Sequence, residues 1–259
     1  MKKSVCIETI FTEVPFEERF KLVEESGFRY IEFWSWEDKN IKKIKELCNK
    51  HNLKIASFSG DKSFSLIDEN EKESYIEYIK ASIRAAKYLD CPNLVIHSNA
   101  LGEGGVVLND YRKISDYDKF STAYDILKAL APIAEEAKIN LVLEALNTIV
   151  DHDGNYLYST SDSAKLVKMI NSDYIKILYD VYHMQIMEGN IIDTIRKYIN
   201  YIGYIHIADV PGRHEPGTGE INFANVFNVL NSLKYDGFIG FELFPSKDSN
   251  IVASKLLNL

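Results

Sequence analysis

The chain is poor in cysteine, has no long apolar run and carries no excess of basic residues. Its three cysteines, Cys6, Cys48 and Cys91, are scattered and form no CxxC pair. This usage argues against disulfides and a thiolate zinc site and is typical of a reducing compartment, so we expect a cytoplasmic location. Because no window of about 18 apolar residues exists, we expect no membrane span. Glu8 interrupts the N-terminal apolar run, which argues against a signal peptide.

The charge balance of the chain is acidic, with a formal net charge of −8. A nucleic-acid-binding protein needs a basic face that displaces counterions from phosphates. We therefore expect neither nucleic acid nor a membrane as a partner. What the chain does have is an ordinary globular composition, with 46% hydrophobic and 26% charged residues, and its 259 residues can bury a sizeable core.

Eight short runs rich in β-branched and aromatic residues alternate with stretches of helical period. The expected strands are residues 4–11, 30–35, 54–60, 93–99, 140–146, 175–181, 202–209 and 237–244. The expected helices lie at 15–27, 38–52, 70–90, 116–138, 161–171, 190–200 and 222–234. This alternation, without a repeat or an obvious linker, predicts a single (β/α)8 barrel domain over residues 1–259. A doubly wound open sheet is the alternative, and the positions of the polar residues distinguish the two.

Polar residues close the last four expected strands. Glu144 closes NLVLE, Asp180 closes IKILYD, His206 lies near the end of IGYIH, and Glu242 lies near the end of FIGFE. In a barrel, strands five to eight are consecutive neighbours, so their C-terminal ends share one part of the mouth. Barrel enzymes build their active sites at this mouth. The pattern therefore predicts that four oxygen and nitrogen donors converge there.

Three carboxylates cannot share a dry site unless a positive charge joins them, because repulsion and desolvation would protonate them. Oxygen donors with one imidazole suit a divalent cation, with Mn²⁺ or Mg²⁺ preferred and Co²⁺ compatible. A single carboxylate at a strand end is ordinarily solvated or caps a helix, and His206 alone could be a core histidine. The prediction of one divalent metal ion therefore depends on the set of four.

Two further residues could contact a substrate. His183 follows Asp180 just past the expected strand, where it could donate to a substrate or be an ordinary loop histidine. The segment 208–223, ADVPGRHEPGTGEINF, contains three glycines and two prolines that constrain its backbone. It carries Arg213 toward the mouth, where a guanidinium could bind a carboxylate through two hydrogen bonds. An ordinary surface arginine is the alternative.

Weaker signals come from three side chains that could face the same mouth: Glu32, Trp34 and His97. The Gly-rich segment 99–110 lacks the Lys-Ser/Thr of a phosphate-binding loop, so we interpret it as a lid. The segment 147–156 is a second candidate lid. We interpret His51 and His152 as surface or loop residues.

Three segments, LYDVYHMQIMEGN (178–190), HIADVPGRHEPGTGEINF (206–223) and FELFP (241–245), together resemble the hydroxypyruvate isomerase family. That family belongs to the xylose-isomerase-like barrels, which also include ketose 3-epimerases and apurinic endonucleases. The resemblance extends over the chain, and EALN around Glu144 also fits it. The segments 97–105 and 149–155 depart from the family pattern, and such loops shape the choice of substrate.

The resemblance implies a barrel with one divalent metal held by Glu144, Asp180, His206 and Glu242. It implies that the two glutamates also act as the acid/base pair. It further implies that His183 and Arg213 contact the substrate.

The function that we predict is the isomerisation of a small hydroxy-oxo acid, hydroxypyruvate to tartronate semialdehyde, through a cis-enediolate. The sequence leaves open a ketose 3-epimerase or a 2-oxo-tetronate isomerase. An endonuclease-like hydrolase would need additional histidines and aspartates at the mouth, and a non-catalytic sugar-acid-binding barrel is the last alternative. The expected partner is a small sugar acid or a ketose, and self-association as a homo-oligomer is compatible with the sequence.

Overall fold

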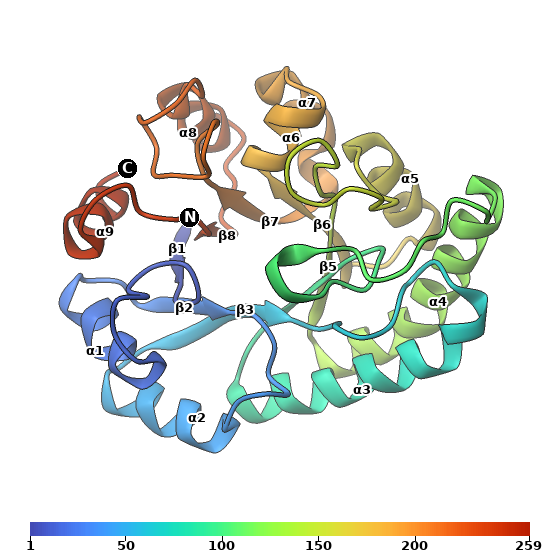
Figure 1. Cartoon of the computed structure of the whole chain (residues 1–259), viewed down its shortest axis with the longest axis horizontal. Coiled ribbons are helices and arrows are strands. Elements are labelled where there is room, and N and C mark those ends of the chain that lie inside the picture. The colour runs from blue at the N-terminus through green and yellow to red at the C-terminus, as the bar shows by residue number, and fades with distance from the viewer.

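The computed structural model describes residues 1–259, and its eight parallel strands close into a barrel in chain order (Figure 1). The strands are β1 (Lys2–Cys6), β2 (Tyr30–Phe33), β3 (Lys54–Ser59), β4 (Asn93–Ile96), β5 (Asn140–Glu144), β6 (Ile175–Asp180), β7 (Ile202–Ile207) and β8 (Phe238–Phe241). The predicted (β/α)8 barrel is confirmed. A doubly wound open sheet is excluded because β1 pairs with both β2 and β8.

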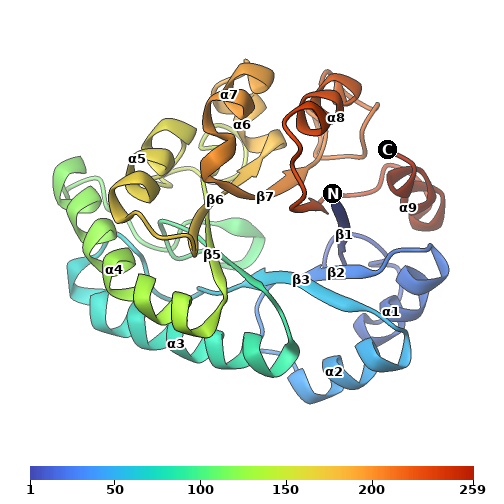
Figure 2. The same cartoon turned by 180° about the vertical axis from the view of Figure 1, so that it is seen from behind.

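Helices surround the barrel on its outside (Figures 1 and 2). They are α1 (Phe16–Glu25), α2 (Ile41–Lys50), α3 (Lys72–Leu89), α4 (Asp116–Ala137), α5 (Thr160–Ile170), α6 (Val181–Met187), α7 (Ile191–Tyr198), α8 (Phe223–Ser232) and α9 (Ser249–Leu257), with 3-10 turns η1 (Glu69–Glu71), η2 (Glu103–Gly105) and η3 (Ile199–Tyr201). None of these helices is both long enough and apolar enough to cross a membrane. The helices α6 and α9 were not predicted from the sequence.

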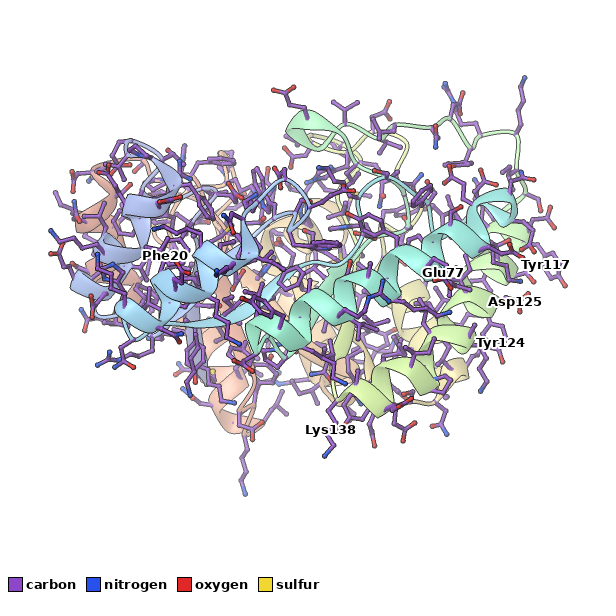
Figure 3. The ribbon with its side chains drawn as sticks, turned by 90° about the horizontal axis from the view of Figure 1, so that it is seen from below. Phe20, Glu77, Tyr117, Tyr124, Asp125 and Lys138 are labelled. Atoms are coloured by element: carbon purple, nitrogen blue, oxygen red, sulfur yellow. The ribbon has the colours of Figure 1, made fainter.

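The helices present a polar face outward and an apolar face to the barrel. In α1, Phe20 and Val23 are buried. Figure 3 shows Tyr117, Asp125 and Lys138 on the outside of α4 and at its C-terminal end. Amphipathic helices of this kind cover the outer face of a barrel and leave its mouth open to loops.

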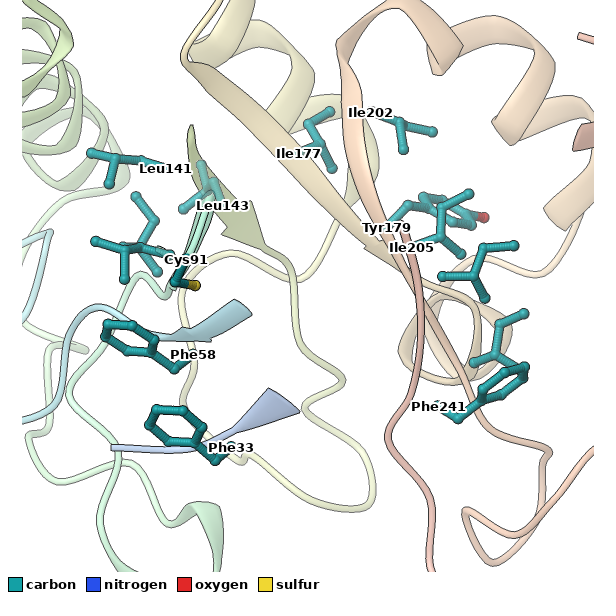
Figure 4. Packing of buried hydrophobic residues seen from close by; sticks show 14 of the residues in the cluster. Phe33, Phe58, Cys91, Leu141, Leu143, Ile177, Tyr179, Ile202, Ile205 and Phe241 are labelled. Carbon is teal, nitrogen blue, oxygen red and sulfur yellow. The ribbon is translucent and has the colours of Figure 1, made fainter. Parts of the chain in front are cut away.

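The alternation of side chains along each strand creates two separate apolar regions. The larger region has 65 buried residues between the strands and the helices, and Figure 4 shows part of it, including Leu141, Leu143, Ile177 and Tyr179. The smaller region lies inside the barrel and takes one residue from each of six strands: Ala56, Val95, Val142, Leu178, Tyr204 and Phe238. This inner apolar layer closes the barrel below the site.

The same alternation delivers the candidate ligands. Two residues beyond the inner apolar layer on β5, β6 and β7 stand Glu144, Asp180 and His206. Because the side-chain period of a strand is two, these polar groups also point into the barrel, one level closer to the mouth. In the register of the sheet, Asp180 lies beside His206. The strand pattern therefore explains why the predicted donors meet.

Candidate active site

The four predicted ligand side chains come together at the barrel mouth. One ligand atom from each of Glu144, Asp180, His206 and Glu242 lies within 4.8 Å of the others. The Nδ1 atom of His206 is 3.6 Å from Glu144 Oε1, 3.9 Å from Asp180 Oδ2 and 3.5 Å from Glu242 Oε2. Glu144 and Asp180 are the last residues of their strands, and Glu242 directly follows β8 rather than lying within it.

The electrostatics of this group favour a bound cation. Glu144 Oε1 and His206 Nδ1 are buried and have no hydrogen-bond partner. Burial and the neighbouring charge of Glu144 raise the pKa of Asp180 to about 7. Three carboxylates and one imidazole form a donor set that suits a divalent ion, which would satisfy both orphaned atoms and keep all three carboxylates ionised. The residues present therefore fit one divalent metal ion.

The second carboxylate oxygen of Glu144 is held by His97. His97 Nε2 lies 3.2 Å from Glu144 Oε2, and its Nδ1 lies 3.0 Å from Asp61 Oδ1. Burial disfavours a charged ring, but the carboxylates of Asp61 and Glu144 outweigh it and raise the pKa of His97 to about 10. Burial likewise opposes a charged Glu144, but the neighbouring His206 ring and the hydrogen bond from His97 hold its pKa well below the usual range. His97 thus faces the site as a charged donor.

Glu242 is held by different donors. Trp34 Nε1 donates to Glu242 Oε1 at 2.7 Å, and the Arg213 guanidinium forms an ion pair with Glu242 Oε2. Burial raises the pKa of Glu242, but the positive charge of Arg213 outweighs burial and lowers it. Each glutamate of the group therefore has one oxygen facing His206 and a partner that favours its ionised form.

The loop between β7 and α8 carries Arg213 to this position. The Asp209 carboxylate organises the loop by accepting backbone N–H bonds from Val210, Gly217, Gly219 and Ile221. Arg213 adopts a left-handed backbone conformation, and its carbonyl accepts the N–H of Phe244 at 2.8 Å. The loop is thereby attached to the segment that follows Glu242. Its glycine at 219 is required, because a Cβ there would collide with the Val210 carbonyl.

His183 lies in the first turn of α6, not in a loop as the sequence suggested, and it is fully buried. Asp180 Oδ1 caps this helix by accepting the N–H groups of Tyr182 and His183 at 2.7 and 3.1 Å. The Nδ1 atom of His183 accepts the backbone N–H of Asn147 at 3.2 Å. Since that nitrogen accepts, the proton of a neutral ring sits on Nε2. Burial and the charge of Arg213 lower the pKa of His183 well below its usual value, so the ring is neutral.

The remaining ring nitrogen of His183 is free to donate a hydrogen bond. Its Nε2 has no hydrogen-bond partner and lies 3.7 Å from Asp180 Oδ2, at the edge of the ligand group. A protonated Nε2 has no lone pair for a metal ion, but it can donate to a substrate oxygen. This geometry supports the prediction that His183 binds substrate rather than metal.

His51 and His152 lie in a turn and a loop, as interpreted from the sequence, but neither is a surface residue because both are buried. His51 Nδ1 pairs with Glu24 Oε2 at 2.8 Å, far from the mouth. His152 is in a loop, but its Nδ1 lies 2.7 Å from the carbonyl oxygen of Gly105 and so joins the loops after β4 and β5. His152, Asp151 and His183 form a second close group of polar side chains beside the first.

One cavity of about 760 Å³ lies at the mouth and is lined by side chains that include Glu144, His206, Glu242, His97, His183 and Arg213. Phe33, Trp34, Phe58 and Phe244 contribute aromatic surface to it. Both candidate lids also line it, through residues 101–105 and 150–152. In Figure 1 these two loops, green and yellow-green, lie in front of the strands, and in Figure 2 they lie behind them. Whether they open and close as lids stays a prediction.

Two residues that hold the site, Asp61 and Asn147, were not predicted from the sequence. Asp61 holds His97, and Asn147 holds His183. Asp61 follows β3 by two residues, so the strand-end pattern that identified the ligands could also have identified it. Asn147 carries no such signal, because its role depends on a contact with His183 across the site.

Comparisons with known proteins agree with this architecture. Residues 20–257 match the family model described as xylose isomerase-like TIM barrel. The chain is 31% identical over 255 residues to hydroxypyruvate isomerase of Escherichia coli, covering 95% of this chain and 94% of that protein. It is 30% identical over 260 residues to 2-oxo-tetronate isomerase of Haemophilus influenzae, covering 94% of this chain and 93% of that protein.

Solved structures give the same picture of the fold. The crystal structure of an AP endonuclease, family 2, from Brucella melitensis is 26% identical, with a TM-score of 0.89, and the match covers 99% of this chain and 98% of that one. The D-psicose 3-epimerase of Clostridium cellulolyticum is 18% identical with a TM-score of 0.83, covers 100% and 97% of the two chains, and shares the fold. With its closed barrel and its match over residues 20–257, the chain belongs to the xylose isomerase-like TIM barrel family.

Proposed function

We propose that the chain is a divalent-metal-dependent isomerase that moves a carbonyl between adjacent carbons of a small hydroxy-oxo acid, either hydroxypyruvate or 2-oxo-tetronate. The observation that carries this proposal is the arrangement of Glu144 and Glu242. Each has one oxygen within 3.6 Å of His206 Nδ1 and a second oxygen held by a donor, His97 or Trp34. Two oriented carboxylates on one group of metal ligands are what a proton transfer between neighbouring carbons requires.

The chemistry that a divalent ion supplies when bound here is stabilisation of negative charge on the substrate oxygens, and Mn²⁺ or Mg²⁺ suits the donor set best. Glu144, Asp180, His206 and Glu242 are the residues that would hold it.

The proton transfers fall to the two glutamates. One glutamate takes a proton from the hydroxyl-bearing carbon, and the C–H electron pair becomes the double bond of an enediolate. The former carbonyl oxygen gains the negative charge and then a proton. The other glutamate, acting as the acid, then delivers a proton to the former carbonyl carbon. The neighbouring hydroxyl gives its proton to the former carbonyl oxygen and becomes the new carbonyl. Phe33 and Phe58 give the cavity an apolar wall beside these groups.

Arg213 and His183 are suited to the remaining part of an acid substrate. Arg213 lines the cavity, and its Nε has no hydrogen-bond partner. A guanidinium and a neutral imidazole N–H can both donate to a carboxylate. The names of the two relatives, hydroxypyruvate isomerase and 2-oxo-tetronate isomerase, support an acid over a neutral ketose. A ketose 3-epimerase would use the same pair of glutamates and is the first alternative.

A hydrolase with several metal ions is the alternative that the likeness to the Brucella melitensis AP endonuclease raises. The group Asp151, His152 and His183 is the place to look for a second ion. However, His183 Nε2 carries the ring proton and offers no lone pair, so only Asp151 and the Nε2 of His152 remain as ligands in this group, against four ligands in the first. We therefore expect a single metal ion per chain. The cysteine usage separately favours a cytoplasmic location.

The test is a screen of the metal-free protein against hydroxypyruvate, 2-oxo-tetronate and several ketoses, with Mn²⁺, Mg²⁺ or Co²⁺ restored, read by NMR of the products in deuterated water. We expect product formation from one of the acids, solvent deuterium on the carbon that accepts the proton, and loss of both on chelation. Mass spectrometry should count one ion per chain. Turnover of ketoses alone would favour the epimerase, three bound zinc ions would favour the hydrolase, and ligand binding without turnover would favour a binding barrel.

A further inference from the structure

A carboxylate inside the barrel holds the side of His206 that faces away from the ligand group. Glu32 on β2 is only 3% exposed, and its Oε2 lies 3.0 Å from His206 Nε2. When Nε2 donates to this carboxylate, a neutral His206 ring carries its proton on Nε2. The lone pair of Nδ1 is then left free, and Nδ1 is the atom that faces Glu144, Asp180 and Glu242.

Glu32 is itself fixed on its other oxygen. Tyr204 Oη donates to Glu32 Oε1 at 2.6 Å, and Ser4 Oγ forms a short hydrogen bond to the same oxygen. Ser4, Glu32 and Tyr204 are buried and come from β1, β2 and β7. The ring of Tyr204 also packs edge-on against His206, with 5.5 Å between centroids. The carboxylate therefore has no freedom to turn away from His206.

The strand β8, which pairs with β7, leaves space for the Glu32 carboxylate. Gly240 on β8 pairs in register with His206, and a Cβ at Gly240 would run into the carboxylate of Glu32. At the level of His206, β8 thus contributes no side chain. Glu242 comes two residues after Gly240, directly after β8 and one level nearer the mouth. In the sequence FIGFE, Gly240 leaves space for Glu32, and the final residue, Glu242, is the candidate ligand.

We propose that Glu32 is a positioning residue for the metal centre, which orients His206 and fixes the ring form that exposes the Nδ1 lone pair. Hydrogen bonds from carboxylates to the distal nitrogen of a ligating histidine have this effect on metal sites in general. The proposal depends on the proposed metal site. A purely structural role explains the network less well, since a buried carboxylate without a Lys or Arg partner is costly to the fold.

The test compares Glu32→Gln with the matched control Ser4→Ala, which removes a hydrogen bond to Glu32 but touches no candidate ligand. Calorimetric titration of the metal-free proteins with Mn²⁺ gives the affinity, and circular dichroism gives the melting temperature without metal. We expect Glu32→Gln to bind Mn²⁺ about 10–100-fold more weakly and to melt close to the wild-type temperature. We expect Ser4→Ala to bind Mn²⁺ close to the wild-type affinity.

The outcomes separate Glu32 from the metal site itself. His206→Ala, titrated in the same way, should lose Mn²⁺ binding; unchanged binding in that variant would mean that the proposed metal site is wrong. If His206→Ala loses Mn²⁺ but Glu32→Gln binds it with wild-type affinity, the positioning role of Glu32 is overturned. An equal fall in Ser4→Ala would also overturn it, because that variant keeps the Glu32 carboxylate with its hydrogen bonds to Tyr204 and His206. Should Glu32→Gln fail to fold, Glu32→Asp, which keeps the charge but not the reach, carries the same expectation.

Discussion

The two halves of the barrel contribute to the site in different ways. The half formed by β5 to β8 supplies the whole candidate ligand group: Glu144, Asp180, His206 and Glu242. The half formed by β1 to β4 and the segments that follow these strands supplies none of it. It supplies instead the groups that hold those ligands by hydrogen bonds. Glu32 bonds to His206, His97 bonds to Glu144, and Trp34 bonds to Glu242.

This difference teaches how a barrel builds a precise site. Residues from one half project toward a common point, and residues from the other half reach across the barrel to fix their orientation. Ligands that are held in place require little reorganisation when a reaction starts, which is the main contribution of a protein to such chemistry. Substitutions of the candidate ligands should therefore abolish function, and substitutions in the supporting half should weaken it by smaller factors.

The largest effect is expected at Glu242. Replacing it with glutamine removes a proton-transferring carboxylate but keeps the shape of the side chain, so turnover should fall at least about a thousandfold. Product formation followed by NMR measures this, and circular dichroism checks that the barrel is folded. Near-normal turnover would remove Glu242 from the catalytic pair. Trp34→Phe, which only removes its hydrogen bond, is the matched comparison from the supporting half and should lose far less.

Asp180→Asn separates two functions of one residue. Asparagine still caps α6, because its side-chain oxygen can accept the N–H groups of Tyr182 and His183. It cannot replace the charge of a ligand, so the Mn²⁺ affinity should fall by more than about a hundredfold, beyond the range for an outer partner. Titration calorimetry and the melting temperature test this together. A variant that melts at a lower temperature but binds Mn²⁺ with wild-type affinity would show that the cap matters more than the ligand.

Arg213→Lys tests whether Arg213 binds the carboxylate of the substrate. Loss of hydrogen bonds to a charged group costs about 1.5–3 kcal/mol, so KM for an acid substrate should rise by roughly tenfold to a hundredfold. Kinetics on an acid and on a neutral ketose, measured side by side, distinguish the causes. An equal loss on both would mean that Arg213 acts through Glu242 rather than through a substrate carboxylate.

His97→Gln belongs to the supporting half and should have a moderate effect. The loss of the charged donor to Glu144 should lower kcat by about tenfold while KM changes little, because the side chain orients a base rather than binds ground-state substrate. Asp61→Asn, which acts one step further away, should give a smaller change in the same direction. A loss as large as that of Glu242→Gln would erase the distinction between the two halves.

The last prediction concerns stability against pH. The folded pKa of His97 is raised to about 10, above its ordinary value of 6.5, so its stabilising contribution is full below pH 6.5 and lost as the pH rises toward 10. Metal-free wild type and His97→Gln, melted at pH 6 and at pH 10, measure this contribution as the difference between the two proteins. That difference should favour wild type at pH 6 and shrink at pH 10; an unchanged difference would contradict it.

The sequence predicted the ligand half better than the supporting half, for a physical reason. A ligand at the end of an apolar strand is visible by its own position, as at Asp180. A supporting residue acts through another side chain, so Glu32, Trp34 and His97 could be proposed only as side chains facing the mouth, without their partners. The burial of His152 could not be predicted, because it depends on a contact with Gly105 in a different loop.

The fold shows the same limit. The barrel and its strand order followed from the alternation of patterns, but the first strand ends at Cys6, before the expected residue 11, because the chain turns there and the N–H groups of Thr9 and Ile10 donate to the Cys6 carbonyl. The short helix α6 was missed because it begins directly after β6 and its N-cap, Asp180, was interpreted only as a candidate ligand. Local patterns identify elements, and tertiary contacts decide where they stop.

The hydrogen bond between His152 and Gly105 has a consequence for engineering this barrel. It ties together two loops that are 47 residues apart in the chain and that both line the cavity. A glycine is required at 105, since any Cβ there would collide with the His152 ring. Grafting either loop alone from a relative would therefore leave a mismatched pair, and a change of substrate preference is best sought by exchanging both loops as one unit.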